Sequence, residues 1–262
     1  MVLNAQPDTN VILSLISGDT GEVTVTSSLT FTSANWDTAQ TVTVTGVDDH
    51  LVDGTETSTI TIAVVDVASD NNFDDVADQT VSVSTTDDDV AGFTIVELEG
   101  STAVDESGTT DTFTVVLNAQ PDSDVVVAIT SSDTGEASSN SPLTFTSSNW
   151  DTAQTVTVTG VDDFLLDGTI TSDLVVAIVD ASSDNNFDPV ADQTVSVSTT
   201  DDDVAGFTVA ETEGSTSVTE AGGTDTFTIV LNAQPDSDVV LSIISSDTGE
   251  ATVTSSLTFT SA

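Results

Sequence analysis

The chain has 262 residues, with no lysine or arginine against 45 aspartates and glutamates, which gives a formal net charge of −45. Nucleic acid, anionic membranes and acidic polysaccharides are poor direct partners for such a chain, because each would be repelled, and cations are its natural counterpart. An apolar fraction of 37% argues against disorder. Cysteine is absent, so no disulfide stabilises the fold. No apolar run approaches the roughly 18 residues of a membrane span, so no membrane insertion is expected.

An internal repeat of 114 residues sets the architecture. The phrase VLNAQPD begins at Val2, Val116 and Val230, and residues 31–49 recur at 145–163 with one change. This period is too long for an ankyrin or leucine-rich repeat and matches the size of one sandwich domain. The sequence therefore predicts a tandem array of near-identical domains.

The acidic phrase DDDVAG, at 87–92 and again at 201–206, indicates the boundaries between copies. We expect a partial copy at 1–90 that lacks its first strands, a complete copy at 91–204 and a partial copy at 205–262 that lacks its last strands. The chain is then expected to be a window from a longer array.

The complete copy shows an alternation of period two and no helical period. Val and Phe alternate with Thr or Ser, as in half-buried strands with apolar side chains inward. The strands are expected at residues 93–98, 112–117, 124–130, 143–146, 155–159, 174–180 and 194–198. About seven short strands separated by turn phrases predict an all-β protein of tandem immunoglobulin-like, Greek-key antiparallel β-sandwiches in a linear array.

Carboxylates concentrate at the ends of these strands, where a sandwich has its two poles. Two carboxylates about 4 Å apart repel by roughly 4 kcal/mol at an effective dielectric constant near 20, and no lysine or arginine offsets this. A hard cation that takes six to eight oxygens does, and Ca²⁺ suits flexible carboxylate-rich loops better than Mg²⁺. Isolated aspartates such as Asp122 are more simply explained as turn residues. In the complete copy the acidic groups are Asp105 with Glu106, Asp133, Asp162 and Asp163 with Asp167, Asp184 with Asp188, and Asp201 to Asp203.

This layout resembles the Calx-beta domain and its bacterial relatives in giant secreted adhesins, including those with repeats-in-toxin C-termini. The resemblance covers all three copies and implies calcium binding and an extracellular, cell-surface location. The residues that carry it are Val218-Thr219-Glu220, the phrase LTFTxxNW at 143–150, the alternating segment 154–158 that leads into Asp162 and Asp163, and the closing Asp201-Asp202-Asp203.

In the Calx-beta family, calcium is held by an early Glu, a loop Asp, an Asp pair with a further acid four residues on, and a terminal acidic triplet. In the complete copy the resemblance assigns these roles to Glu106, Asp133, Asp162, Asp163, Asp167, Asp201, Asp202 and Asp203. In the first copy it assigns them to Asp19, Asp48, Asp49, Asp53, Asp87, Asp88 and Asp89, with Glu56 as an additional acid. The early Glu of the first copy falls before residue 1, and Ile170 stands at the place of Glu56 in the second, so the number of ions per copy stays open.

No catalytic set is present. His50 is the only histidine, and Phe164 replaces it in the next copy, so neither a Ser-His-Asp nor a Cys-His arrangement can form and no enzyme is expected. Trp36 and Trp150 each precede a strand within the same phrase, a position typical of an aromatic that seals a core rather than one that stacks on a sugar.

The favoured function is a structural extender segment of a large extracellular, calcium-stabilised bacterial surface adhesin or fibre. Calcium ions and neighbouring repeats, or adjacent copies of the chain, are its expected partners, and calcium would rigidify the junctions between domains. Two alternatives stay open. One is a self-assembling filament whose partial end domains complete one another by strand exchange, and the other is an adhesive or glycan-binding module.

Overall fold

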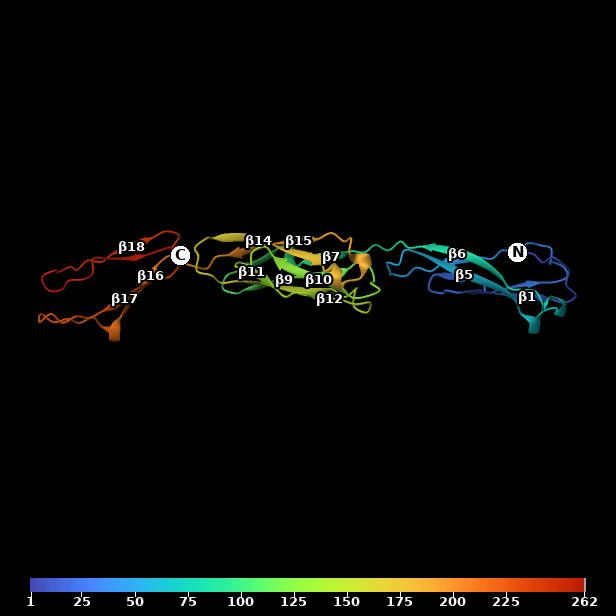
Figure 1. Cartoon of the computed structure of the whole chain (residues 1–262), viewed down its shortest axis with the longest axis horizontal. Coiled ribbons are helices and arrows are strands. Elements are labelled where there is room, and N and C mark those ends of the chain that lie inside the picture. The colour runs from blue at the N-terminus through green and yellow to red at the C-terminus, as the bar shows by residue number, and fades with distance from the viewer. Residues whose placement is uncertain (262) are drawn as a thin grey trace.

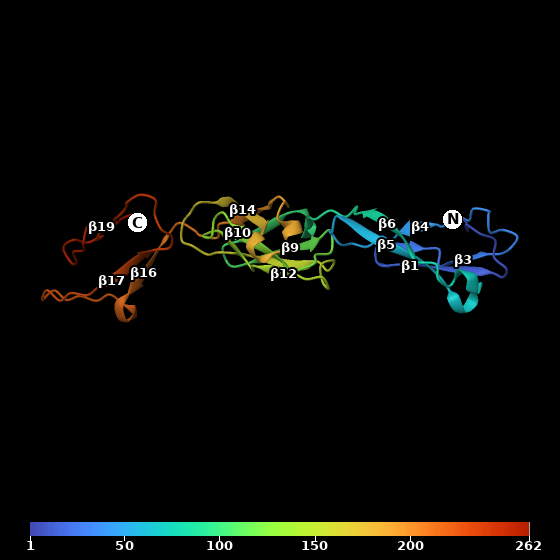
Figure 2. The same cartoon turned by 45° about the vertical axis from the view of Figure 1, so that its right-hand side comes forward.

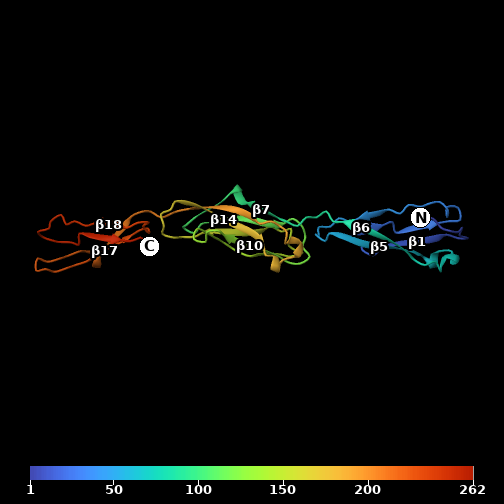
Figure 3. The ribbon, with the colours of Figure 1, turned by 45° about the horizontal axis from the view of Figure 1, so that its top comes forward.

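The chain folds into three β-rich units that follow one another in a line (Figure 1). The computed structural model describes residues 1–261. The first unit holds strands β1 to β6, the second β7 to β15 and the third β16 to β19. The two turned views in Figure 2 and Figure 3 show the same elongated row, with the first and third units at its two ends.

The second unit is a sandwich of two sheets. A five-stranded sheet has the order β12-β10-β14-β15-β8, and a four-stranded sheet has the order β11-β13-β9-β7. All its strand pairs are antiparallel except β8 with β15, which is parallel. The strands are β7 (Phe93–Glu97), β8 (Thr102–Asp105), β9 (Thr110–Leu117), β10 (Val125–Ser131), β11 (Ala137–Ser139), β12 (Leu143–Phe145), β13 (Gln154–Gly160), β14 (Thr169–Ile178) and β15 (Gln193–Thr200).

The core of this sandwich follows from the alternation in its strands. Successive side chains of a strand point to opposite faces, so Phe113, Val115 and Leu117 of β9 all face inward and are buried. Phe187 lies in a short 3₁₀ turn, η5 (Asn185–Phe187), and fills the end of the core with no exposed surface. Trp150 is partly buried and packs against the same core. The expected all-β sandwich with apolar side chains inward is confirmed.

The structure adds two strands to those expected from the sequence. The first expected strand stops at Glu97, because the short turn η3 (Leu98–Gly100) places Glu99 and Gly100 at positive φ angles of 62° and 82° and redirects the chain. After this turn β8 joins the opposite sheet, beside β15. The other addition, β11, is only three residues long and polar at two of them, so its alternation is too short to detect.

The first unit repeats part of this architecture and has its own core. Its main sheet has the order β3-β1-β5-β6, and β2 pairs with β4. Val11, Phe31 and Ile60 are among its buried residues. Its elements are β1 (Val11–Ser17), β2 (Val23–Val25), β3 (Ser28–Phe31), β4 (Val44–Gly46), β5 (Thr55–Val64), β6 (Gln79–Thr86) and the 3₁₀ turns η1 (Asp66–Ala68) and η2 (Asn71–Phe73).

The third unit consists of two separate two-stranded ladders, β16 with β17 and β18 with β19. None of its described residues is buried. Its elements are β16 (Phe207–Glu211), η6 (Thr212–Gly214), β17 (Phe227–Leu231), β18 (Val239–Ser242) and β19 (Ser256–Phe259), and the remaining turn of the chain, in the second unit, is η4 (Asp180–Ser182). The exact limits of the copies, at 90/91 and 204/205, stay a prediction.

Within residues 1–261 the helices are all single 3₁₀ turns, and none is long and apolar enough to cross a membrane.

Candidate metal centre

Glu106 is a buried carboxylate without a hydrogen-bond partner. It directly follows β8, and its backbone N–H donates to the carbonyl oxygen of Thr200 at 3.1 Å, which fixes it beside the end of β15. Its side chain has no exposed surface, and within residues 1–261 neither carboxylate oxygen accepts a hydrogen bond. Burial, and then the nearby charge of Asp163, raise the pKa of Glu106 from 4.5 to about 7. A buried charge in this state is unfavourable unless a cation neutralises it.

Two triads of carboxylates share Glu106. The first adds Asp163 and Asp203, and the second adds Glu136 and Asp167; within each triad, one oxygen per residue lies within 4.8 Å of the others. Glu136 is 5% exposed, and its Oε2 is buried without a partner, as is Oδ2 of Asp203. Burial is the largest cause of the raised pKa of Glu136, Asp167 and Asp203, followed by the charge of the neighbouring carboxylates.

Main-chain contacts hold the triads in place. Asp201 accepts hydrogen bonds from the N–H groups of Gly168 at 3.0 Å and Asp203 at 2.7 Å, and these bonds lower its pKa. Asp201 therefore ties the acidic triplet at the end of β15 to the loop that carries Asp167. Oδ1 of Asp163 accepts a hydrogen bond from the N–H of Leu165 at 2.6 Å.

The other residues expected at this site lie close to the triads but outside them. Asp133 accepts a hydrogen bond from the N–H of Gly135 at 3.0 Å and so shapes the turn that leads to Glu136. Asp162 and Asp202 contribute to the raised pKa of Asp203, so they are electrostatic neighbours of the site.

Glu136 and its first-unit counterpart Glu22 were missed from the sequence. Both end the phrase Asp-Thr-Gly-Glu, which recurs at 19–22, 133–136 and 247–250. The recurrence of this Glu in all three copies is the signal that identifies it. The family resemblance points only to the Asp of the phrase, whereas the turn directs the Glu into the cluster.

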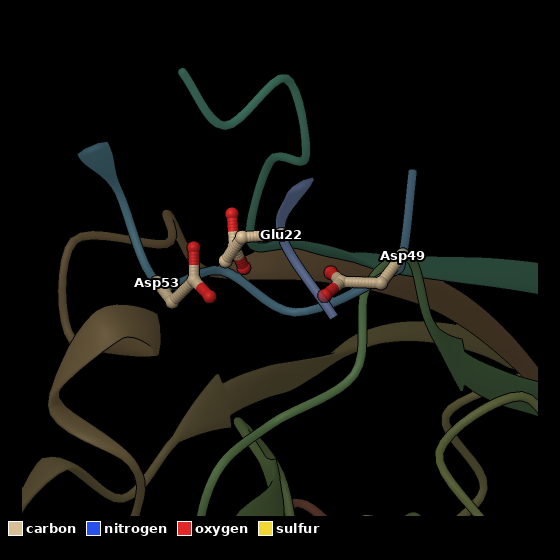
Figure 4. Close-up of side chains that lie close together, drawn as sticks. All are labelled: Glu22, Asp49 and Asp53. Carbon is tan, nitrogen blue, oxygen red and sulfur yellow. The ribbon is translucent and has the colours of Figure 1, made fainter. Parts of the chain in front are cut away.

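The first unit has a smaller version of the cluster. Glu22, Asp49 and Asp53 offer oxygens within 4.8 Å of one another, and Figure 4 shows their carboxylates turned toward a common space. Burial and then Asp53 raise the pKa of Glu22, and burial and then Asp49 raise that of Asp53. In this triad Glu22 and Asp53 are half-buried and Asp49 is exposed, so none of its three carboxylates is buried as Glu106 is.

Most of the remaining residues expected in the first copy border the same place. Asp48, Asp87, Asp88 and Asp89 line a hollow of about 30 Å³ together with the triad. Asp87 accepts hydrogen bonds from Gly54 at 2.9 Å and Asp89 at 2.7 Å, which repeats the contacts of Asp201. Two others lie outside the hollow: Asp19 accepts from Gly21 at 2.9 Å, and Glu56 is exposed on β5.

The donor set fits a hard divalent cation. Every converging group is a carboxylate, and the chain has no lysine, arginine or cysteine that could pair with it or select a softer metal. The two unpartnered oxygens of Glu106 are the observation that separates this cluster from an ordinary acidic surface.

No family model matches the chain, and no curated protein matches it. Among solved structures, domains 4 and 5 of the S-layer protein SbsC align at 16% identity over 72% of this chain and 70% of that chain, with a TM-score of 0.35. The apo form of the Calx CBD1 domain aligns at 14% identity over 42% of this chain and 98% of that chain (TM-score 0.31), and the calcium-binding domain CBD12 of CALX1.1 at 12% over 67% and 71% (TM-score 0.28). Similarity at this level assigns neither a ligand nor a function to this chain.

Proposed function

We propose that this chain is a structural extender segment of a large extracellular surface adhesin or fibre, in which Ca²⁺ rigidifies the junctions between successive β-sandwiches. The observation that carries the proposal is Glu106, a fully buried carboxylate without a partner, at the end of the second unit from which the chain continues into the third. A catalytic role is not part of the proposal.

Calcium supplies the positive charge that the chain, without lysine or arginine, cannot supply. Glu106 takes part in both triads, so its ionised form is opposed by four other carboxylates and by burial. A divalent cation removes this penalty, and flexible carboxylate-rich sites are those that Ca²⁺ prefers. Two triads share Glu106 in the second unit and the first unit has one triad among the described residues, which supports a proposal of two ions in the second unit and one in the first.

The free energy available from binding is large enough to matter for a fold without disulfides. Extracellular calcium modules bind with dissociation constants of about 10⁻⁴ to 10⁻³ M. A site with a dissociation constant of about 10⁻⁴ M gains roughly 1.4 to 2.7 kcal/mol of stability at about 1 to 10 mM free calcium.

The position of the site connects this stabilisation to the shape of the molecule. Asp203 belongs to a triad and lies only four residues before β16 of the third unit. A cation bound there would hold the short connection between two units close to the sandwich. The row of units in Figure 1 is the shape expected of an extender. The filament and adhesive alternatives stay predictions.

Thermal unfolding and small-angle scattering of the whole chain, in calcium and in chelator, test the proposal. We expect calcium to raise the melting temperature and to keep the maximum dimension near that of a straight row of three units, and chelator to broaden the distribution of dimensions. An unchanged melting temperature together with an unchanged scattering profile would reject the extender mechanism. Isothermal calorimetry gives the number of ions bound.

A further inference from the structure

One short loop in the first unit and its counterpart in the second carry both triad carboxylates and the contact to the following unit. In the second unit this coupling loop is residues 163–167. Its two end residues, Asp163 and Asp167, belong to the two triads around Glu106. The three residues between them, Phe164, Leu165 and Leu166, are apolar and lie next to the third unit.

The middle of the coupling loop docks on the third unit through its main chain. The carbonyl oxygen of Phe164 accepts a hydrogen bond from the N–H of Gln234 at 2.6 Å, and Leu165 forms a parallel β-bridge with Gln234. Leu166 lines an apolar cavity of about 390 Å³ together with third-unit residues that include Phe207 and Pro235.

The junction between the first and second units repeats this docking. The carbonyl oxygen of His50 accepts a hydrogen bond from the N–H of Gln120 at 2.7 Å, and Leu51 forms a parallel β-bridge with Gln120. These residues lie 114 positions before their counterparts in the second junction. The contact is preserved although His50 is replaced by Phe164, because it is made by the main chain.

Side chains of the second unit add to the first junction. The Nδ2 group of Asn186 donates a hydrogen bond to the carbonyl oxygen of Val52 at 2.6 Å. The ring of His50 lies 5.6 Å from that of Trp150, centroid to centroid. The first-unit loop at 49–53 therefore contacts the second unit through three consecutive residues, His50, Leu51 and Val52.

A hydrogen bond links the two functions of the loop directly. Oδ1 of Asp163 accepts from the N–H of Leu165, the residue that pairs with Gln234. The first unit has the same link, because Oδ1 of Asp49 accepts from the N–H of Leu51 at 2.9 Å. In both units, a hydrogen bond therefore connects a triad carboxylate to the residue that bridges to the next unit.

We propose that metal binding in one repeat and docking of that repeat on the next are coupled through this loop, an inference that rests on the proposed function. Without a cation, Asp163 and Asp167 repel each other and Glu106, which favours a loop that moves away from the sandwich. With a cation, Asp163 and Asp167 are drawn together, and Phe164 and Leu165 are held in contact with Gln234. Because coupling is reciprocal, docking must also tighten cation binding.

Amide hydrogen exchange of the whole chain, followed by NMR, tests the coupling. The amide of Gln234 reports docking, and that of Gln6 is a matched internal control, because it occupies the same position of the first unit and, within residues 1–261, donates no hydrogen bond to another unit. We expect calcium to slow exchange at Gln234 about fivefold or more and to leave Gln6 unchanged. Asp167→Asn should abolish the effect, and Asp173→Asn, which removes an exposed carboxylate of β14, should preserve it.

The reciprocal test measures calcium affinity. Gln234→Pro removes the N–H group that donates a hydrogen bond to the carbonyl oxygen of Phe164. Gln6→Pro makes the same change at the matched control position of the first unit. In a chain whose first triad is disabled by Glu22→Gln, calorimetry should show about fivefold weaker binding for Gln234→Pro than for Gln6→Pro.

The outcomes separate this inference from the proposed function. Calcium binding without any change at Gln234, or equal affinities for the two proline variants, would overturn the coupling and leave calcium binding intact. Absence of binding heat in the unmodified chain would overturn the proposed function itself.

Discussion

Gly160 lies so close to Asp105 that a Cβ atom at position 160 would be 1.9 Å from the carbonyl oxygen of Asp105. The end of β13 and the end of β8 therefore touch main chain to main chain. This contact sets the position of Glu106, the next residue after Asp105, and with it the centre of both carboxylate triads.

Gly160→Ala should therefore destabilise the second unit and weaken its calcium binding. Main-chain atoms cannot move aside as a flexible side chain can, so we expect a loss of about 2 kcal/mol or more. Gly46→Ala is the matched control, because a Cβ there would lie 3.8 Å from the nearest atom, an ordinary contact. Urea unfolding measures each variant in its own unit: Trp150 emission in a Trp36→Phe background follows Gly160→Ala, and Trp36 emission in a Trp150→Phe background follows Gly46→Ala. Equal stability of the two alanine variants would contradict the prediction.

Glu106→Gln should have opposite effects in chelator and in calcium. In chelator it removes a buried charge that other carboxylates oppose, so the melting temperature of the second unit should rise. In calcium it removes a ligand common to both triads, so the stabilisation by calcium should be lost. Calorimetric scans in both conditions measure the change, with Asp173→Asn as the charge-matched control. A variant that keeps the full calcium-induced shift would exclude Glu106 as a ligand.

The stability of the calcium-free second unit should fall as the pH rises. Glu106 has a pKa of about 7 in the folded chain, raised by burial and nearby carboxylates from 4.5. The folded state thus binds a proton more tightly than the unfolded state; the corresponding stability is complete below pH 4.5 and is lost as the pH rises through 7. Urea unfolding in chelator at pH 5, 6, 7 and 8 measures this trend. Glu106→Gln should flatten it, and a trend that persists in the variant would assign it to other groups.

Calcium affinity should rise as the pH rises, which is the reverse of the stability trend. Binding requires ionised carboxylates, so the apparent dissociation constant should increase as the pH falls below 7 and protons compete for Glu106. Calorimetry in two buffers of different ionisation enthalpy should also detect release of a proton on binding at pH 6. Affinity that is constant between pH 5.5 and 8 would contradict the role given to Glu106.

A different carboxylate, Asp70, should stabilise the first unit without any metal. Its Oδ2 accepts hydrogen bonds from the N–H groups of Asp8 at 2.6 Å and Thr9 at 3.0 Å, and its Oδ1 accepts from Asn72 at 3.0 Å. These bonds lower its pKa below 3.8, so its contribution is present above pH 3.8 and is lost as the pH falls through the lowered value.

Asp70→Ala should therefore lower the melting temperature of the first unit equally in calcium and in chelator, whereas Asp74→Ala, at the exposed end of the same turn, should have little effect. Emission of Trp36 in a Trp150→Phe background follows this unit. A destabilisation that appears only in calcium would place Asp70 in the metal site instead.

The strands and the tandem repeat were predictable because both are local or periodic properties. Val156 and Val158 alternate with Thr, and this pattern alone defines the inward face of β13. The strand β8 was not predictable in the same way, because the positive φ angles at Glu99 and Gly100 transfer the chain to the other sheet without any change in alternation.

The choice of converging carboxylates was only partly predictable. Neighbouring residues of an extended chain point in opposite directions, so one member of each acidic pair turns inward and the other outward. Asp163 and Asp203 join a triad, whereas Asp162 and Asp202 do not. Sequence adjacency does not reveal which member turns inward.

The amino-acid sequence by itself determined that this protein is an acidic array of β-sandwich repeats with uncompensated carboxylates at strand ends, because composition, period and alternation are written along the chain. Only the tertiary structure decided that Glu106 is buried without a partner and that Glu136 faces it. Both follow from the meeting of strand ends that are far apart in sequence. The same convergence placed the loop residues that bridge to the next unit between two triad carboxylates.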